Sequence, residues 1–355
     1  MDIHFNGYKI KYNLLNYYMQ SIRQSHVIHT INIFIDLDDL YHTLRRPLIN
    51  NEFQACGTNA TRQLASNVLN IAGHYRNWAI KEGLQPTIYL VYTSNKRIFR
   101  NNSYIHNYRK SFIEKASIDN GNNFFINSAI DNSTALYQLI SNYINKVYII
   151  DSKYLEPSII PKYIMDKYNS DWNIIISRDT YMCQYAYMDK CSMISPKGDN
   201  STYINTGNVW KYVNYRERIY KEDLEDLSLL TPKLFVSIKS IVGDRYRNIP
   251  RIHKIGWKTI LNYLIKDLDS GISEELQLKR FLQFIEKKKV LDEEIEPNII
   301  CTNIEYQVAS LIDTDKIMID NQLVDKYDYS ALLELNNKYF NRFPLNLHFL
   351  CSVIK

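Results

Sequence analysis

No stretch of this chain carries the apolar run of about 18–20 residues that a helix needs to cross a bilayer. Residues 1–30 also lack the apolar core of a signal peptide, because they mix Asn, Tyr, Lys and Gln throughout. Internal repeats and low-complexity tracts are missing as well. The sequence therefore predicts no membrane contact, no secretion and a cytoplasmic location.

Cysteine is sparse, and its pattern excludes two common stabilising devices. The chain has five cysteines, an odd number, and none of them forms a Cys-x-x-Cys pair. This usage fits a reducing compartment and argues against both a disulfide framework and a structural zinc site. The five are Cys56, Cys183, Cys191, Cys301 and Cys351.

The bulk composition is that of an ordinary globular protein, with 45% hydrophobic and 23% charged residues. A chain of 355 residues can bury a large core, as one elaborated domain or as a main domain with a helical extension. The net charge of +5 does not by itself indicate nucleic acid. Abundant Asn, Ile, Lys and Tyr indicate the coding bias of an AT-rich genome such as that of a virus or phage. The location would then be the host-cell cytoplasm or the virion.

Apolar segments of two kinds alternate along the first half of the chain. Short β-branched runs predict buried strands, and apolar residues at three- and four-residue spacing predict helices. The predicted strands are 31–35, 86–92, 147–150 and 173–177, and the predicted helices are 60–81, 136–144 and 157–168. Such alternation produces parallel βαβ units. We therefore expect an α/β fold with a mostly parallel central sheet and helices on both faces.

The second half of the chain is predicted to be mainly helical. The predicted helices are 224–239, 259–266, 273–289, 304–311 and 329–339, with the charged stretch 292–297 as a linker. We expect three parts: an N-terminal extension at 1–30, an α/β domain at 31–222 and a helical region at 223–355.

Two acids follow predicted strands. Asp36 comes directly after 31–35, and Asp179 comes two residues after 173–177. Ligands of parallel sheets bind beyond the carboxyl ends of the strands, so we expect these two side chains to lie at one edge.

The most informative segment is a turn followed by the start of a helix. Gly243-Asp244 precedes residues 248–250 (Asn-Ile-Pro), and Gly256 leads into Lys258. This segment resembles the metal- and DNA-binding turn of the flap endonuclease / 5′→3′ exonuclease family. The resemblance extends over roughly residues 31–264, and it implies a PIN-like α/β domain followed by a helix-3-turn-helix.

Other segments match this family in the same order along the chain. Residues 34–40 resemble its opening strand, which places Asp36 at the first metal-ligand position. Residues 99–109 resemble the arch that receives a single-stranded 5′ end. Residues 175–181 resemble another metal-ligand segment, in which Asp179 is retained.

Most of the acids that the resemblance implies are replaced. Of the positions usually acidic in phage and bacterial members, only Asp36, Asp179 and Asp244 hold an acid. Glu156 is displaced by one residue, which at the start of a helix would turn its side chain about 100° away. The replaced positions hold Thr93, Leu155, Pro157, Ser158, Tyr181 and Arg247.

These losses determine which cofactor we expect. Two-metal phosphodiester hydrolysis needs two divalent ions about 3.5–4 Å apart, and Mg²⁺ takes oxygen ligands. We therefore expect either no cofactor or one weakly bound Mg²⁺ at Asp36, Asp179 and Asp244, and we assign no catalytic residue. Arg247 is hypothesised to be an internal counter-ion for Asp244 or a neighbouring retained acid, filling the vacated metal volume.

Basic residues concentrate in two segments that the resemblance assigns to DNA. Residues 239–258 and residues 96–115 each hold six Lys or Arg against one acid. Such clusters bind phosphates in a salt-sensitive way, and Tyr104, Tyr108 and Phe112 are suited to stack on unpaired bases. The predicted nucleic-acid-binding residues are Lys96, Arg97, Arg100, Arg109, Lys110, Lys239, Arg245, Arg251, Lys254 and Lys258.

Three functions remain open. The first is a catalytically lapsed 5′-nuclease fold that binds branched or single-stranded DNA, alone or in a viral replication or DNA-processing complex. The second is a working Mg²⁺-dependent 5′→3′ exonuclease or flap endonuclease in which Glu156 or Asp151 substitutes for lost acids. The third is a structural or assembly subunit of a viral complex. The missing acids favour the first, with DNA as the expected partner and a viral protein as a further one.

Overall fold

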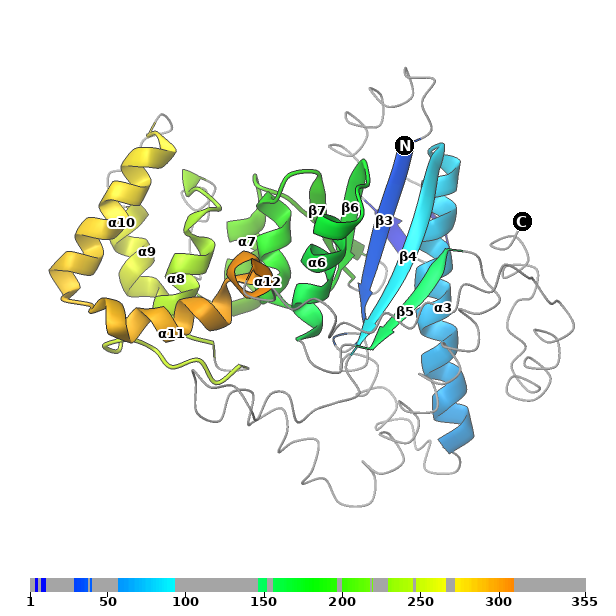
Figure 1. Cartoon of the computed structure of the whole chain (residues 1–355), viewed down its shortest axis with the longest axis horizontal. Helices are drawn as coiled ribbons and strands as arrows, with labels where there is room; N and C mark the ends of the chain where they lie inside the picture. The colour runs from blue at the N-terminus through cyan, green and yellow to red at the C-terminus, as the bar shows by residue number, and fades with distance from the viewer. Residues whose placement is uncertain are drawn as a thin grey trace, which may run out of the picture.

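The computed structural model describes residues 4–5, 8–10, 29–37, 39, 57–92, 146–151, 156–196, 200–217, 219, 229–244, 247–265 and 272–309. Within this part of the chain the strands form one sheet in the order β1-β2-β8-β7-β6-β3-β4-β5 (Figure 1). The strands are β1 (His4–Phe5), β2 (Tyr8–Ile10), β3 (His29–Asp36), β4 (Leu84–Tyr92), β5 (Val147–Asp151), β6 (Trp172–Ile176), β7 (Cys191–Ser195) and β8 (Asn200–Ile204).

The sheet is mostly parallel, as the alternating pattern predicts. β3 pairs in parallel with β4 and β6, and β4–β5, β6–β7 and β2–β8 are parallel too. Among the strand pairs of the described sheet, only β1–β2 and β7–β8 are antiparallel. Central β3 is buried on both faces from residue 31 to residue 36, which is why it appears in the sequence as a continuous apolar run.

Alternate side chains of the strands enter different layers. Phe34, Val91 and Ile175 belong to a core cluster that includes α6 (Ile160–Lys167). The opposite face is covered by α3 (Gly57–Lys81), which packs on β3 and β4. Because successive strand residues point to opposite faces, both faces are closed by helices, and the predicted fold class is confirmed.

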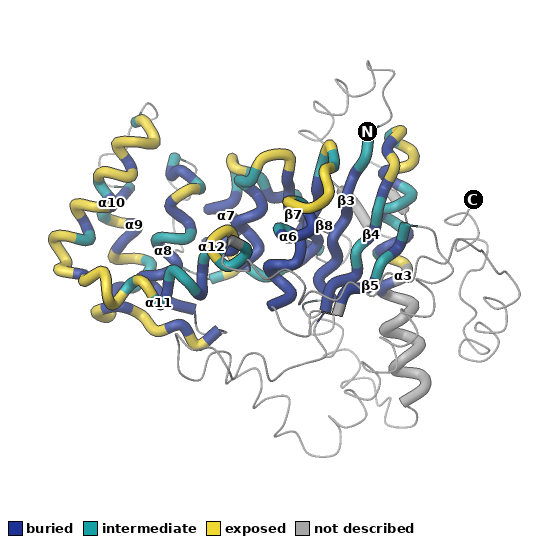
Figure 2. Tube along the Cα trace, viewed as in Figure 1, coloured by how far each residue is buried: buried dark blue, intermediate teal, exposed yellow. Residues whose placement is uncertain are grey.

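The remaining helices lie on the far side of β6 and β7 from α3, as Figure 1 shows. They share the α6-side core, which extends from Phe34 to Ile304, and only their outer surfaces, above all on α10, are exposed (Figure 2). These elements are η3 (Pro157–Ile159), η4 (Thr180–Tyr187), α7 (Val209–Glu217), α8 (Leu234–Val242), α9 (Trp257–Ile265), α10 (Glu274–Lys288), α11 (Asp292–Thr302) and α12 (Ile304–Ala309).

Two predictions about helix boundaries are wrong. Of the helix predicted at 224–239, residues 224–228 lie outside the described residues, residues 229–233 are not α-helical, and α8 begins at Leu234. Pro232 accounts for this, because the residue before a proline disfavours the helical backbone. The predicted linker 292–297 is the first half of α11, where acidic residues in the first turn favour a helix start despite Pro297.

Part of the expected N-terminal extension belongs to the sheet. β2 pairs with β8 through Lys9–Asn200 and Ile10–Ser201. A strand of three residues is too short to show alternation in the sequence. The predicted helices 136–144 and 329–339 lie outside the described residues, as do the arch-like residues 99–109 and the basic segment 96–115 that contains them.

Among the helices that the structure describes, none combines the length and the apolar character needed to span a bilayer.

Candidate functional site

The retained acids meet at the carboxyl edge of the sheet. Asp36 is the last residue of β3, and Asp179 accepts the Tyr181 N–H at 3.0 Å to cap η4. Ser177 links the two acids: its Oγ donates to Asp36 Oδ2 at 2.9 Å and accepts the Asp179 N–H at 3.1 Å. The second oxygen of Asp36 accepts the Asp39 N–H at 3.1 Å. The structure thus brings Asp36 and Asp179 together.

Arg247 is buried in the middle of this group, with only 2% of its surface exposed. Its Nη2 and Nη1 donate to the two oxygens of Asp179 at 2.5 and 3.2 Å, and its Nε donates to Glu156 Oε1 at 3.2 Å. Nη1 also lies 3.5 Å from Asp244 Oδ2. The planar guanidinium therefore forms a bidentate ion pair with Asp179, and its positive charge offsets part of the negative charge of three carboxylates. This confirms the hypothesis that Arg247 is an internal counter-ion.

Glu156 reaches Arg247 because it precedes a helix instead of lying in one. Its backbone is extended, with φ −66° and ψ 130°, and it is the residue before η3. The 100° rotation per helical residue does not apply to an extended residue. The expectation that Glu156 points away from the site is therefore wrong.

Two positions at which the resemblance implies acids contact each other. The Cζ atom of Arg247 lies 3.9 Å from the centroid of the Tyr181 ring, and Tyr181 is fully buried. A guanidinium stacked on an aromatic face gains a cation–π contact that a carboxylate could not make. These two departures from the acidic pattern are thus one packed pair.

Lys239 is a second internal cation, which corrects its assignment to nucleic acid. Its side chain is 2% exposed; its Nζ donates to Glu217 Oε1 at 2.8 Å and lies 3.3 Å from Asp244 Oδ2. Burial alone would lower the pKa of Lys239, but Asp244 and Glu217 outweigh it and raise the pKa above its ordinary value. A charged amine held in this way cannot reach a phosphate on the surface.

The donor set does not fit a divalent ion shared by the retained acids. Arg247 occupies both oxygens of Asp179 and one of Asp244, and the oxygens of Asp36 accept from Ser177 and a backbone N–H. Mg²⁺ would need these same oxygens at about 2.0–2.1 Å. In the described part of the chain, no group of three or more His, Cys, Asp or Glu is arranged to hold a metal ion. The arrangement therefore disagrees with the expected Mg²⁺ site.

A further acid, which the sequence did not single out, supports the edge of the site. Asp39 accepts the Arg178 N–H at 2.8 Å and lies 3.4 Å from Arg178 Nε. Burial raises the pKa of Asp39, an effect that Asp179 increases and Arg178 opposes. The Asp39–Arg178 pair thus anchors the loop that leads from β6 to Asp179.

The turn after α8 is fixed by backbone contacts. Asp244 and Ile249 form an antiparallel bridge with N···O distances of 3.0 and 2.9 Å. Asn298 of α11 donates from Nδ2 to the carbonyls of Ser240 at 2.7 Å and Pro250 at 2.9 Å. The buried amide of Asn298 donates to both carbonyls and so holds the turn between α8 and α11.

Gly243 is required at the start of this turn. Its φ is +74°, and an added Cβ would lie 2.5 Å from the Ile249 carbonyl oxygen and 2.9 Å from the Pro250 carbonyl carbon. Because both neighbours are backbone atoms, we expect Gly243→Ala to lower the free energy of unfolding by about 2–4 kcal/mol, measured by urea denaturation. Gly207→Ala is the control: its Cβ would meet only Asn205 Oδ1 at 3.4 Å. Equal losses in the two variants would show that the turn relaxes.

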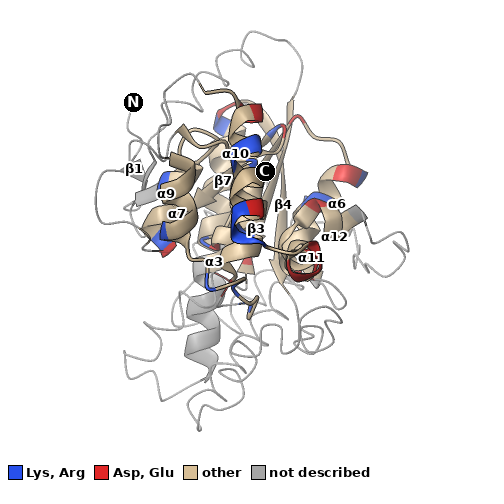
Figure 3. Cartoon of the chain, turned by 90° about the vertical axis from the view of Figure 1, so that its left-hand side faces the viewer, with Lys and Arg blue, Asp and Glu red and all other residues tan. Residues whose placement is uncertain are grey.

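The other predicted nucleic-acid-binding residues fall into two groups. Arg251, Lys254 and Lys258 are exposed around the turn and the start of α9. Lys254 has a left-handed backbone with φ +58°. The acidic start of α11 borders this surface, since Glu294 pairs with His253 at 2.8 Å, whereas both signs mix along α10 (Figure 3). Lys96, Arg97, Arg100, Arg109, Lys110 and Arg245 lie outside the described residues.

No model of a known protein family matches the chain, and no curated protein matches it in sequence. Several solved structures have a similar backbone fold. One is a bacteriophage T5 flap endonuclease in a pseudo-enzyme–product complex with DNA and metal ions, at 15% identity and a TM-score of 0.49, covering 86% of this chain and 99% of that one.

Two further similar structures are complexes with DNA. The catalytic core of Rad2 with DNA substrate has 9% identity and a TM-score of 0.41, covering 91% of this chain and 92% of that one. Human GEN1 with Holliday junction DNA has 11% identity and a TM-score of 0.40, covering 91% of this chain and 70% of that one. Similarity at this level does not assign the chain to a family.

Proposed function

We propose that this protein binds DNA through its basic turn and does not cleave it with divalent metal. The observation that carries the proposal is the placement of Arg247 among Glu156, Asp179 and Asp244, at distances of 2.5–3.5 Å. Two-metal hydrolysis needs open carboxylate oxygens to hold its ions. Here a protein cation holds those oxygens.

The turn offers the chemistry for contact with a phosphate backbone. Arg251, Lys254 and Lys258 lie exposed on one short segment, and the bridge between Asp244 and Ile249 fixes that segment. Each cation that neutralises a phosphate adds sequence-independent, salt-sensitive affinity. We propose branched or single-stranded DNA as the ligand and a viral replication or DNA-processing complex as the setting.

A binding titration in EDTA tests the proposal. A labelled 5′-flap DNA is expected to bind, and the double variant Lys254→Ala/Lys258→Ala should reduce the slope of log K against log salt by about 1 per lost phosphate contact. Lys167→Ala, an exposed lysine on α6, is the matched control and should leave the slope unchanged. In Mg²⁺ or Mn²⁺ no DNA product is expected.

Two outcomes would replace the proposal with another function. Metal-dependent product that disappears in Asp36→Ala would show an active Mg²⁺-dependent 5′→3′ exonuclease or flap endonuclease. Absence of binding to flap and single-stranded DNA alike would point to the assembly role, with a protein as partner of the basic turn.

A further inference from the structure

We infer that Arg247 and Lys239 are the resident cations of the acid cluster, and that they replace divalent metal in holding the basic turn against the edge of the sheet. This concerns the internal structure of the site. It rests on the proposed function only where DNA affinity is used as a readout.

The two cations join one continuous network. Both cations contact the same carboxylate oxygen: Asp244 Oδ2 lies 3.5 Å from Arg247 Nη1 and 3.3 Å from Lys239 Nζ. Beyond Arg247 the network reaches Asp179 and Glu156. Beyond Lys239 it reaches Glu217, whose Oε1 also accepts from Thr180 Oγ1 at 2.8 Å.

The four carboxylates come from separate parts of the chain. Glu156 precedes η3, Asp179 follows β6, Glu217 ends α7 and Asp244 follows α8. Both cations come from α8 and the turn after it, so every ion pair except those with Asp244 ties the turn segment to the α/β layer or to α7. Ions bound between carboxylates of different segments would make the same kind of tie.

The burial of the network determines how much its ion pairs contribute to the stability of the fold. Arg247 and Lys239 are each 2% exposed, Asp244 is 3% exposed and Glu156 is 8% exposed at the side chain. Removing one charge from a buried pair leaves its partner uncompensated, which is strongly destabilising. Carboxylates freed in this way repel one another and attract added divalent ions, which the wild-type network has no room to take.

Thermal unfolding with and without metal provides the test. The wild-type melting temperature is expected to change by no more than about 1 °C between EDTA and millimolar Mn²⁺, because the described residues form no site that binds the ion. Arg247→Met, which keeps an unbranched apolar side chain but removes the charged guanidinium, should melt about 10 °C lower in EDTA. Millimolar Mn²⁺ should recover part of that loss, and bound Mn²⁺ should appear in the electron paramagnetic resonance spectrum of this variant only.

Two variants distinguish the network from a general effect of losing a cation. Lys258→Met removes an exposed charge close to the turn and should change neither the melting temperature nor its response to Mn²⁺. Arg247→Met/Asp179→Asn removes a charge of each sign and should melt higher than Arg247→Met alone. If the single variant does not fold, a folded double variant would still show that the unpaired Asp179 charge causes the loss of stability.

DNA affinity provides an independent readout. Arg247→Met should weaken flap binding several-fold in EDTA although Arg247 cannot touch phosphate, because the turn loses its tie to the sheet. If wild-type protein binds no DNA, the proposed function fails while the melting data still test the network. A wild-type melting temperature that rises by several degrees in Mn²⁺, or an Arg247→Met variant as stable as wild type, overturns the inference.

Discussion

Lys239→Met is expected to lower the free energy of unfolding by about 3–5 kcal/mol, because it leaves the partly buried Glu217 without its cation and the buried Asp244 with Arg247 alone. Urea denaturation at neutral pH measures the loss. Lys258→Met, a change of the same kind on an exposed lysine, should stay within about 0.5 kcal/mol of wild type. A loss below about 1 kcal/mol in Lys239→Met would contradict the ion pairs seen around its Nζ.

The pH dependence of this difference follows from the raised pKa of Lys239. A lysine whose pKa is higher in the folded state than in the unfolded state stabilises the fold fully below the unfolded value, and loses that contribution as the pH rises through the folded value. The stability gap between wild type and Lys239→Met should therefore be constant through neutral pH. It should narrow only as the pH rises above about 10.5.

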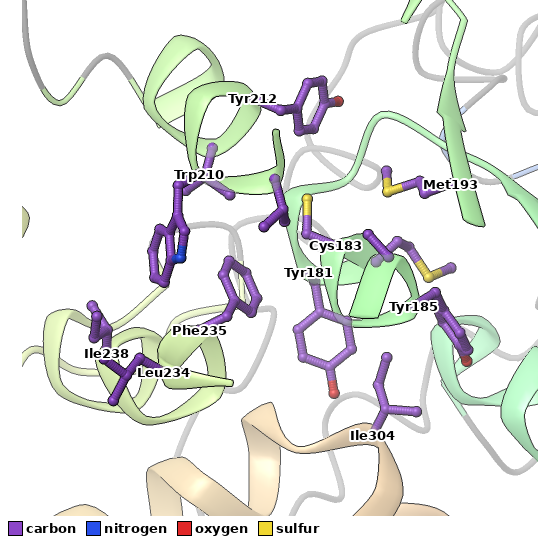
Figure 4. Packing of buried hydrophobic residues seen from close by; sticks show 14 of the residues in the cluster. Tyr181, Cys183, Tyr185, Met193, Trp210, Tyr212, Leu234, Phe235, Ile238 and Ile304 are labelled. Carbon is purple, nitrogen blue, oxygen red and sulfur yellow. The ribbon is translucent and has the colours of Figure 1, made fainter. Parts of the chain in front are cut away.

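Trp210→Ala should have an effect of similar size, for an apolar reason. The Trp210 side chain is 2% exposed, and its ring centroid lies 5.9 Å from that of Phe235 (Figure 4). The ring centroid of Trp257 lies 6.4 Å away, so Trp210 joins α7, α8 and α9. Its Nε1 donates to the Thr231 carbonyl at 3.2 Å. Truncation leaves a cavity and removes one of the two hydrogen bonds to the Thr231 carbonyl, which keeps the Leu234 N–H at 3.2 Å. We therefore expect a loss of about 3–5 kcal/mol in urea denaturation, most of it from the cavity.

Two controls separate packing from hydrogen bonding at this position. Trp210→Phe keeps most of the ring but removes the N–H, and it should lose about 1–3 kcal/mol. Tyr215→Ala removes an aromatic ring from the same helix that is 59% exposed, and it should change the free energy of unfolding by no more than about 0.5 kcal/mol. Similar losses for Trp210→Ala and Tyr215→Ala would contradict the described core.

The sequence was sufficient to predict the elements that carry a strong period. β3 and β6 are buried on two faces, β4 ends in a buried apolar run, and α3 carries apolar residues at helical spacing. Each of these elements was predicted within three residues at either end. Parallel order followed from alternation, because parallel strands need a crossover. The position of Asp36 could be predicted for the same reason, because predicting the strand also predicts the residue at its end.

Short or irregular elements escaped prediction. β8 has five residues and lies against β7 and β2 only, so its pairing partners determine its conformation more than its own side chains do. The 3₁₀ helix η4 has no apolar period that distinguishes it from a loop. α7 mixes buried Trp210 and Val213 with exposed Tyr215, which blurs its pattern.

At the site, the residue types indicated which charges would balance one another, but they did not indicate which side chains would be buried. An arginine at a position where the resemblance implies an acid indicated a counter-ion, and Arg247 does pair with Glu156, Asp179 and Asp244. A lysine inside a basic segment indicated a phosphate contact, yet Lys239 points inward to Glu217. Glu217 lies in a part of the chain where no motif marks it, so only the three-dimensional contact identifies the pair.

The pairing of β2 with β8 has a consequence for shortened versions of the chain. β8 would be an open edge if the protein began at His29, with backbone N–H and C=O groups free to pair with another molecule. β2 contributes only three residues and β1 only two, and strands this short are poor templates for further addition. β1 and β2 therefore cover part of the β8 edge, and we expect a chain without them to self-associate more readily even where the fold itself survives.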